Sequence, residues 1–235
     1  NIASMKSHGI EFTISSKNIQ SKDFSWNTDF IFSKAKNEVT ELNARSSVMD
    51  LVSGYGFARQ GYPVRGLFSI PFVGLSSNGI PMYNINGKIT STDIDFQTRD
   101  NIDYLKYEGP TDPTITGSFG NIFTYKAFKL NVFITYSFGN VVRLNPCFNY
   151  QYSDLSSMPR EFKNRWTVPG DEKHTNIPAI ISKRQYEDNK DLMYAYNAYN
   201  YSTERIAKGD FIRMKEISLS YDFPKSWITS AKISN

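Results

Sequence analysis

The sequence predicts an all-β protein, namely a segment of a transmembrane antiparallel β-barrel with about eight strands and long extracellular loops. Three observations support this. The aromatic content is 15%, with 17 Phe and 15 Tyr among 235 residues. Apolar and polar side chains alternate over several stretches of about ten residues. The predicted turns are short at one end of the sheet and long at the other. Alternation with a period of two marks a strand with one dry and one wet face.

Two neighbouring strands show the alternation most clearly. Residues 127–138 place an apolar side chain at every even position. Residues 113–125 alternate in the same way, and only Lys126 and Ala127 separate the two segments, which predicts a tight hairpin. In the first of these strands we expect the following side chains to face lipid: Phe128, Leu130, Val132, Ile134 and Tyr136.

Three further alternating segments complete the clear part of the pattern. Residues 10–15 and 24–33 are joined by a short polar stretch and predict a second hairpin. The last full strand ends at Pro224, which cannot donate to a ladder. Arg213 and Lys215 share its apolar register, so we expect both to lie above the bilayer, beside the long loop. The lipid-facing side chains predicted for this strand are Ile217, Leu219, Tyr221 and Phe223.

Weaker patterns at residues 64–75 and 80–85, and a partial strand near Ala231, bring the count to seven strands and a stub. A closed eight-stranded barrel is rejected, because the stub is too short to pair with the first strand. Open strand edges are not viable in lipid. We therefore predict that residues 1–235 are the C-terminal portion of a wider barrel, whose other strands lie outside this sequence.

The predicted long connections span residues 34–63, 86–112 and 139–209. The last is the longest, and we interpret it as an extracellular loop with a short helix near residues 154–166. Aromatic rings on loops can stack on sugars or on peptide side chains. The alternative is that they pack the loop against itself or against a partner. The candidate substrate or partner contacts are Trp166, Tyr194, Tyr196, Tyr199 and Tyr201.

Composition excludes several classes of protein. The charged fraction of 21% and the net charge of +4 fit neither a disordered chain nor a dedicated nucleic-acid binder. The longest uncharged stretch, residues 66–87, is interrupted by Pro and Gly, so it does not supply the roughly 20 apolar residues of a spanning helix. A single cysteine, Cys147, excludes an internal disulfide.

Residues suited to catalysis are scarce. His8 and His174 have no spacing typical of a metal site, and Asp171 and Glu172 are adjacent, which makes a poor acid/base pair. We therefore expect no enzymatic activity, no metal site and no cofactor. A calcium site built from loop carboxylates stays open as an alternative.

Short motifs occur in a characteristic order along the chain. They include Gly109-Pro110-Thr111-Asp112-Pro113, Pro169-Gly170-Asp171-Glu172 and Lys208-Gly209-Asp210-Phe211. Together they resemble one family, the SusC/RagA-type TonB-dependent outer-membrane transporters, from about Asn1 to the end of the chain. The resemblance implies a barrel of about 22 strands with an N-terminal plug.

The resemblance also implies a function. Such proteins import oligosaccharides or oligopeptides across the outer membrane of Gram-negative, Bacteroidota-like cells. Energy comes from TonB through the N-terminal part, and a SusD-like surface lipoprotein acts as a lid over the loops. Transporter and lid pairs are expected to form a homodimer in the outer-membrane lipid, with no role for nucleic acid.

Two other hypotheses compete with this one. A soluble β-sandwich that binds carbohydrate would pack the dry faces of two sheets on each other. A passive porin would share the barrel wall, and only a plug and a TonB box, both outside this sequence, separate it from an active importer.

Overall fold

The computed structural model describes residues 3–54, 58–148, 157–224 and 227. The chain divides into two compact units. We call residues 7–36, 113–139 and 209–235 the sheet unit, and residues 1–6, 37–112 and 140–208 the loop unit. No helix among the described residues is long and apolar enough to cross a membrane.

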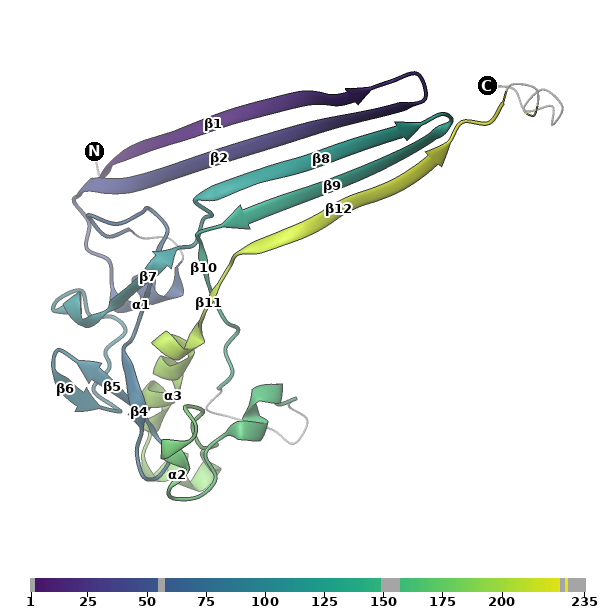
Figure 1. The fold of residues 1–235 in the computed structure, drawn as a ribbon. Coiled ribbons are helices and arrows are strands. Elements are labelled where there is room, and N and C mark those ends of the chain that lie inside the picture. Colours follow the sequence, from purple (N-terminus) through teal and green to yellow (C-terminus); the bar gives the residue numbers. More distant parts are fainter. Residues whose placement is uncertain (1–2, 55–57, 149–156, 225–226, 228–235) are drawn as a thin grey trace. The chain divides into compact units, whose positions relative to one another are not determined.

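Five long strands form one sheet in the order β1-β2-β8-β9-β12 (Figure 1). Both predicted hairpins are confirmed, and the turn at Lys126 and Ala127 is reached with Lys126 in the left-handed region at φ 51°. β1 and β2 extend well beyond the predicted segments. The bounds are β1 (Ala3–Gln20), β2 (Phe24–Leu42), β8 (Ile115–Tyr125), β9 (Phe128–Phe138) and β12 (Phe211–Tyr221).

The connections between these strands alternate in length, as the sequence predicts. Residues 21–23 and 126–127 make the short turns, whereas residues 43–114 and 139–210 make the long connections. Residues 34–42 of the predicted loop 34–63 instead belong to β2. The rest of that loop and the predicted loop 86–112 are parts of one continuous connection. Each hairpin is local in sequence, whereas β2 pairs with β8 across the first long connection.

Two of the weaker predicted strands exist but do not join the five-stranded sheet, which corrects the strand count. The segment 64–75 splits at Pro71 into β3, whose four residues are all buried, and β4. Burial on both faces suits a globular unit rather than a wall with one wet side. The predicted strand near Ala231 lies outside the described residues. The small sheets pair β3 (Gly66–Ser69) with β7 (Lys106–Pro110), and β4 (Phe72–Leu75) with β5 (Pro81–Ile85) and β6 (Lys88–Thr90).

Short helices complete the loop unit. α1 (Val48–Ser53) begins at a capping box in which the side chains of Ser47 and Asp50 each accept from the other's backbone amide. In the described part of the predicted helix 154–166 there is a 3-10 turn, Arg160–Asn164. The other elements are η1 (Ile102–Tyr104), β10 (Val141–Arg143), η3 (Asp171–Lys173), α2 (Lys183–Asp188), α3 (Leu192–Asn200), η4 (Thr203–Arg205) and β11 (Ile206–Lys208).

Every buried apolar side chain among the described residues belongs to the loop unit. One cluster forms around α1, β3 and Tyr83, and a second forms around α3, Phe148 and Phe162. The loop unit therefore has the hydrophobic core of a small globular domain. In contrast, the described part of the sheet unit contains no such core, although its strands are rich in Phe, Ile and Leu.

Candidate functional site

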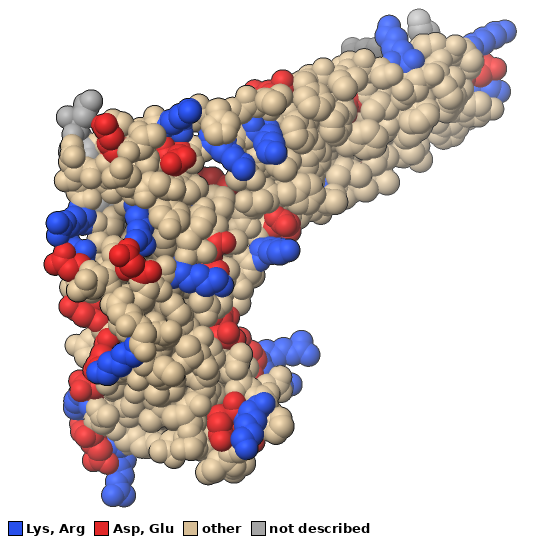
Figure 2. All heavy atoms as spheres, turned by 60° about the vertical axis from the view of Figure 1, so that its left-hand side comes forward, with Lys and Arg blue, Asp and Glu red and all other residues tan. Residues whose placement is uncertain are grey.

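One face of the sheet unit is largely apolar, and many of its side chains are exposed; we call it the dry face. The ladder places Phe119 opposite both Phe30 and Ile134, and Leu219 opposite Leu130. Leu219 and Ile217 are 69% and 67% exposed. In water, exposed apolar area of this kind costs about 25 cal/mol per Å². Exposed dry faces also contradict the β-sandwich hypothesis, in which they would be covered. Along the sheet, Figure 2 shows few charged side chains between the two ends.

The predicted lipid-facing residues share this dry face. Eight of them are placed there by the register of β9 and β12, and Phe223 follows the end of β12 with its ring 5.2 Å from that of Tyr221. The eight are Phe128, Leu130, Val132, Ile134, Tyr136, Ile217, Leu219 and Tyr221.

The opposite face of the sheet is polar; we call it the wet face. Ser118 lies opposite Thr135, and the Asn131 amide donates to the Glu216 carboxylate at 2.9 Å. On the first hairpin, Ser15 donates to the Asp29 carboxylate at 2.6 Å. Carboxylates need water or hydrogen-bond donors, so this face suits an aqueous lumen.

A β-bulge corrects the expectation for Arg213 and Lys215. The register shifts between Met214 and Glu216, so Lys215 is the extra residue of the bulged strand. On the N-terminal side of the bulge, Met214 lies opposite Ile134 on the dry face, whereas Arg213 lies opposite Thr135 on the wet face. Arg213 thus reaches the wet face and not a dry-face position above the bilayer, because one inserted residue reverses the alternation.

The dry face contains one amide side chain in β8, and its oxygen accepts two hydrogen bonds. The Asn121 side-chain oxygen accepts from the Trp26 indole at 2.9 Å and from the Thr28 hydroxyl at 2.8 Å. Asn18 donates to the same Thr28 hydroxyl at 2.6 Å. Because an unpaired polar group is costly in a nonpolar medium, this network lets the dry face tolerate polar atoms.

The motif residues lie at strand ends and in tight loops. Gly109 has φ 144°, and a Cβ there would come within 3.2 Å of the Val141 side chain. Asp112 pairs with Arg65 at 3.1 Å. Within the sheet unit, Asp210 accepts from the Gly139 amide at 2.7 Å, which joins the ends of β9 and β12. These contacts give the motifs a structural role in shaping the strand ends.

The Pro169–Glu172 motif closes a small loop. One Asp171 oxygen accepts from the Thr167 amide, the Thr167 hydroxyl and the Val168 amide at 2.9 to 3.0 Å. These hydrogen bonds, led by the Thr167 amide, lower the pKa of Asp171. The pKa of Glu172 is lowered by backbone hydrogen bonding and by the Trp166 indole. Both carboxylates are therefore occupied with their own loop.

Trp166 lies in the loop unit beside the turn at Gly79. Its indole donates to Glu172 at 3.1 Å, and a Cβ on Gly79 would lie 2.5 Å from the nearest atom of the Trp166 ring. Gly79 also has φ 73°, which favours glycine. Trp166 is half-buried, and its ring packs closely against the turn at Gly79.

The predicted tyrosines divide into buried and exposed side chains. Tyr196 and Tyr199 are each 2% exposed and pack from α3 against Phe148. Burial raises the pKa of Tyr199 well above its usual value. Tyr201 is half-buried beside Arg143, and among the predicted tyrosines Tyr194 is the exposed one, at 42%.

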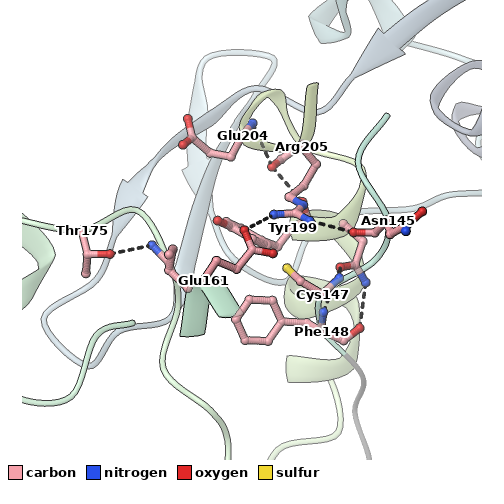
Figure 3. Close-up of polar contacts among 11 residues, drawn as sticks. Asn145, Cys147, Phe148, Glu161, Thr175, Tyr199, Glu204 and Arg205 are labelled. Atoms are coloured by element: carbon pink, nitrogen blue, oxygen red, sulfur yellow. Dashed lines mark hydrogen bonds and ion pairs between the residues drawn. The ribbon is translucent and has the colours of Figure 1, made fainter. Parts of the chain in front are cut away.

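Arg205 holds the backbone in place at Asn145, just before Cys147 and Phe148 of the second cluster. Figure 3 shows its guanidinium between the Glu161 carboxylate, at 2.7 Å, and the Asn145 carbonyl, also at 2.7 Å. The Arg205 side chain is 6% exposed. Beside it, burial raises the pKa of the Cys147 thiol to about 12, so this thiol stays protonated at neutral pH.

Arg143 plays a similar part in the first cluster. Its guanidinium donates to the carbonyl oxygens of Val52, Ser202 and Phe68, the last at 2.6 Å, and to the Ser69 hydroxyl. Burial lowers its pKa to about 10. Neither arginine was singled out from the sequence, because no local pattern marks an arginine that binds backbone carbonyls far along the chain.

A cleft of about 590 Å³ opens beside α3 in the loop unit. It combines apolar and polar groups, which is typical of ligand sites. Tyr194 and Tyr196 were predicted contacts and both line it, whereas Trp166, Tyr199 and Tyr201 do not. The remaining lining residues had no local sequence signal: Met49, Asp95, Phe96, Gln97, Phe148, Met193 and Asn197. Among the described residues, no three His, Cys, Asp or Glu side chains gather as metal ligands.

No family model matches the sequence. Among curated proteins, the chain is 25% identical to TonB-dependent receptor P3 of Formosa agariphila, over 97% of the chain and 23% of the relative. It is 26% identical to TonB-dependent receptor SusC of Bacteroides thetaiotaomicron, over 97% of the chain and 22% of SusC. The chain thus spans about a quarter of the length of these relatives.

Solved structures share the fold. A structure of the RagAB peptide transporter matches 99% of the chain and 24% of its own chain, with a TM-score of 0.68 and 20% identity. The RagAB peptide importer in its closed-closed state gives a TM-score of 0.67 with 22% identity over 97% of the chain. The fold of the chain is therefore that of a segment of these transporters.

Proposed function

From the premise that this chain is a segment of a SusC/RagA-type TonB-dependent receptor, we propose that it forms part of the wall and extracellular loops of an outer-membrane nutrient importer. The exposed dry face is the observation that carries the proposal. Its side chains stay uncovered in the described structure, and hydrocarbon is the solvent that removes the cost of exposing them. The wet face of the same strands then lines the lumen.

The outer edges of β1 and β12 fit a wider barrel. In the described sheet each has a strand on one side only. Unpaired edges are not viable in lipid, so we propose that both pair with further strands of a barrel of about 22, of which this chain is the C-terminal portion.

The loop unit suits capture of substrate on the cell surface. It has its own core, so its surface is held in place rather than assembled on binding. We propose that the cleft at Tyr194 contacts an imported oligosaccharide or oligopeptide beneath a SusD-like lipoprotein lid. Energy would arrive through TonB and the plug, and transporter and lid pairs would form a homodimer. The names of the relatives, SusC and the RagAB peptide importer, support this assignment.

The wall assignment is tested with a matched pair of variants in the full-length receptor. Leu219→Arg places a charge on the dry face, at a cost of about 2 to 4 kcal/mol near the bilayer midplane. Ser218→Arg places the same charge on the wet face of the same strand. We expect the first variant to be lost from the outer-membrane fraction and the second to assemble. Equal assembly of the two would contradict the proposal.

The transport assignment is tested by uptake. Cells that carry the intact receptor should take up a labelled oligopeptide or a labelled oligosaccharide in a TonB-dependent way, and the purified receptor should retain a SusD-like lipoprotein. Uptake that persists without TonB would instead indicate a passive porin. Correct membrane assembly without uptake of either probe would refute the substrate assignment while leaving the wall intact.

A further inference from the structure

A basic patch adjoins the apolar part of the dry face on the first hairpin. The rings of Phe12 and Phe32 stack across β1 and β2 at 5.0 Å, so even-numbered residues of both strands share the dry face. The same alternation, continued toward the long connections, places His8, Lys34 and Lys36 on that side. All three are exposed. We call them the basic patch.

Contacts across the hairpin bring the members of the patch together. The Ser7 hydroxyl donates to the Lys36 carbonyl at 3.3 Å, and a Cβ on Gly9 would lie 2.7 Å from the Lys34 carbonyl oxygen. His8, which lies between Ser7 and Gly9, is thus beside both lysines. Within the described part of the chain, neither lysine has an acidic group within ion-pair distance.

The two sides of this hairpin differ in charge. The wet face has Glu11, which accepts from Ser33 at 2.9 Å, Asp29, which accepts from Ser15, and Lys17. On the dry side, the charged side chains of β1 and β2 within the described sheet unit are the two lysines of the patch, and Glu38 follows on β2 where the strand enters the loop unit. An anion is thus better matched to the dry side than to the wet side.

The patch also lies at a defined height along the strands, at the edge of the apolar band of the dry face. On β1 the apolar residues of the dry face are Ile10, Phe12 and Ile14, and from Ser16 onward that face is polar. The apolar band on this strand is therefore displaced toward the long connections, as expected where strands cross the membrane at a tilt of about 35 to 45°. On β2, Lys34 is the first dry-face residue after the apolar band, on the side of the long connections. A lysine there can lay its stem on apolar surface and hold its ammonium in the headgroup layer.

Resting on the proposed function, we infer that the basic patch binds the phosphate groups of anionic lipid headgroups in the outer leaflet that borders the barrel. Lysine ammonium groups donate well to phosphate oxygens, and His8 adds a ring N–H donor between them. The lipid is bound from outside the wall, so this site is separate from the import path. It ties the first hairpin to the leaflet on the long-connection side.

The test uses the full-length receptor in detergent micelles, titrated with monophosphoryl lipid A and followed by native mass spectrometry. A lysine near an anionic lipid surface contributes about fivefold in affinity, so the Lys34→Gln, Lys36→Gln double variant should bind about 25-fold more weakly. The control is Lys17→Gln with Lys129→Gln, which removes the same charge from odd-numbered positions that face the wet side. Unchanged binding by the first variant, or an equal loss in the control, would overturn the inference.

Two further measurements identify the source of the phosphate and distinguish this inference from the wall assignment on which it rests. Inorganic phosphate should not compete with lipid A at equal concentration, and phosphatidylcholine should not saturate the site. Competition by free phosphate would show an ordinary anion site and refute lipid binding. The double variant should still reach the outer membrane and import substrate, so its lipid-binding defect is distinct from the assembly defect expected of Leu219→Arg.

Discussion

The ring of Tyr136 in β9 covers Gly117, the residue directly opposite it in β8. The Tyr136 hydroxyl reaches past the glycine and donates to the Ile31 carbonyl of β2 at 2.9 Å. Three neighbouring strands are thus joined by one side chain on the dry face. The contact requires glycine, because a Cβ would meet the Tyr136 hydroxyl and the Ile31 carbonyl oxygen far inside van der Waals distance.

Gly117→Ala should therefore destabilise the barrel by about 2 to 3 kcal/mol, since one of the atoms in the way is backbone and cannot move aside. Thermal unfolding of the full-length receptor in detergent measures this. Gly120→Ala is the matched control, because its nearest neighbour is the flexible Phe133 ring at 3.3 Å. Equal stability of both variants would show that the Tyr136 contact has no such requirement.

Deletion of Lys215 should remove the bulge in β12 and leave the faces of its neighbours unchanged. Met214 would stay opposite Ile134 on the dry face and Arg213 opposite Thr135 on the wet face, because only the unpaired extra residue is lost. A Met214→Cys probe should therefore resist aqueous maleimide with and without the deletion, while the buried Cys147 stays silent. Reaction of the probe after the deletion would show that its face had reversed, and that Lys215 is not the extra residue.

The pair of Arg205 and Glu161 should be more sensitive to loss of one partner than of both. Glu161→Leu leaves the enclosed guanidinium without its anion and should cost about 2 to 3 kcal/mol, near the lower limit for buried pairs because the Glu161 side chain is 35% exposed. The Arg205→Met, Glu161→Leu double variant should recover part of this. Thermal unfolding of the intact receptor gives the comparison, and a double variant no more stable than Glu161→Leu alone would contradict the prediction.

Acid should open the Thr167–Glu172 loop. The pKa of Asp171 is lower in the folded protein than its ordinary 3.8, so its hydrogen bonds stabilise the loop above that pH and are lost as pH falls through the folded pKa. Amide exchange at Thr167 and Val168, corrected for intrinsic rates, should rise in that range. Asp171→Asn should exchange faster at neutral pH and lose the acid dependence, whereas Lys173→Gln should behave like the parent protein.

Tyr194 and Tyr199 distinguish a ligand role from a packing role. Tyr194→Ala should lower substrate uptake with little change in stability, since the ring is exposed beside the cleft. Tyr199→Ala should instead destabilise the loop unit by about 3 to 5 kcal/mol, as expected for a fully buried aromatic ring. Uptake and thermal unfolding, measured on both variants, separate the two effects. Unchanged uptake by Tyr194→Ala would remove this residue from the substrate path.

Alternation alone predicted the strands of the sheet unit, because β8 and β9 each have one dry and one wet side over their whole length. The bulge was not predicted, because Arg213 and Lys215 have the same parity in the sequence as Ile217. Only the pairing with β9 reveals the inserted residue. A single extra residue leaves no mark in composition or periodicity.

The loop unit was far less predictable. Residues 64–75 look like a barrel strand because both kinds of strand favour β-branched and aromatic residues. Tyr196 and Tyr199 are three positions apart, which is one face of a helix, and this spacing was the available signal that they are buried together. For Arg143 no such signal exists, because its carbonyl partners at Val52 and Phe68 come together only in the folded chain.

The absence of buried apolar side chains from the described sheet unit means that the bilayer completes its tertiary structure. Without lipid or detergent, the five strands would keep their hydrogen bonds but would expose their apolar face to water. Copies of the chain would then aggregate through these faces. In the cell, such a chain needs chaperones between synthesis and membrane insertion, and its purification requires detergent or lipid at every step.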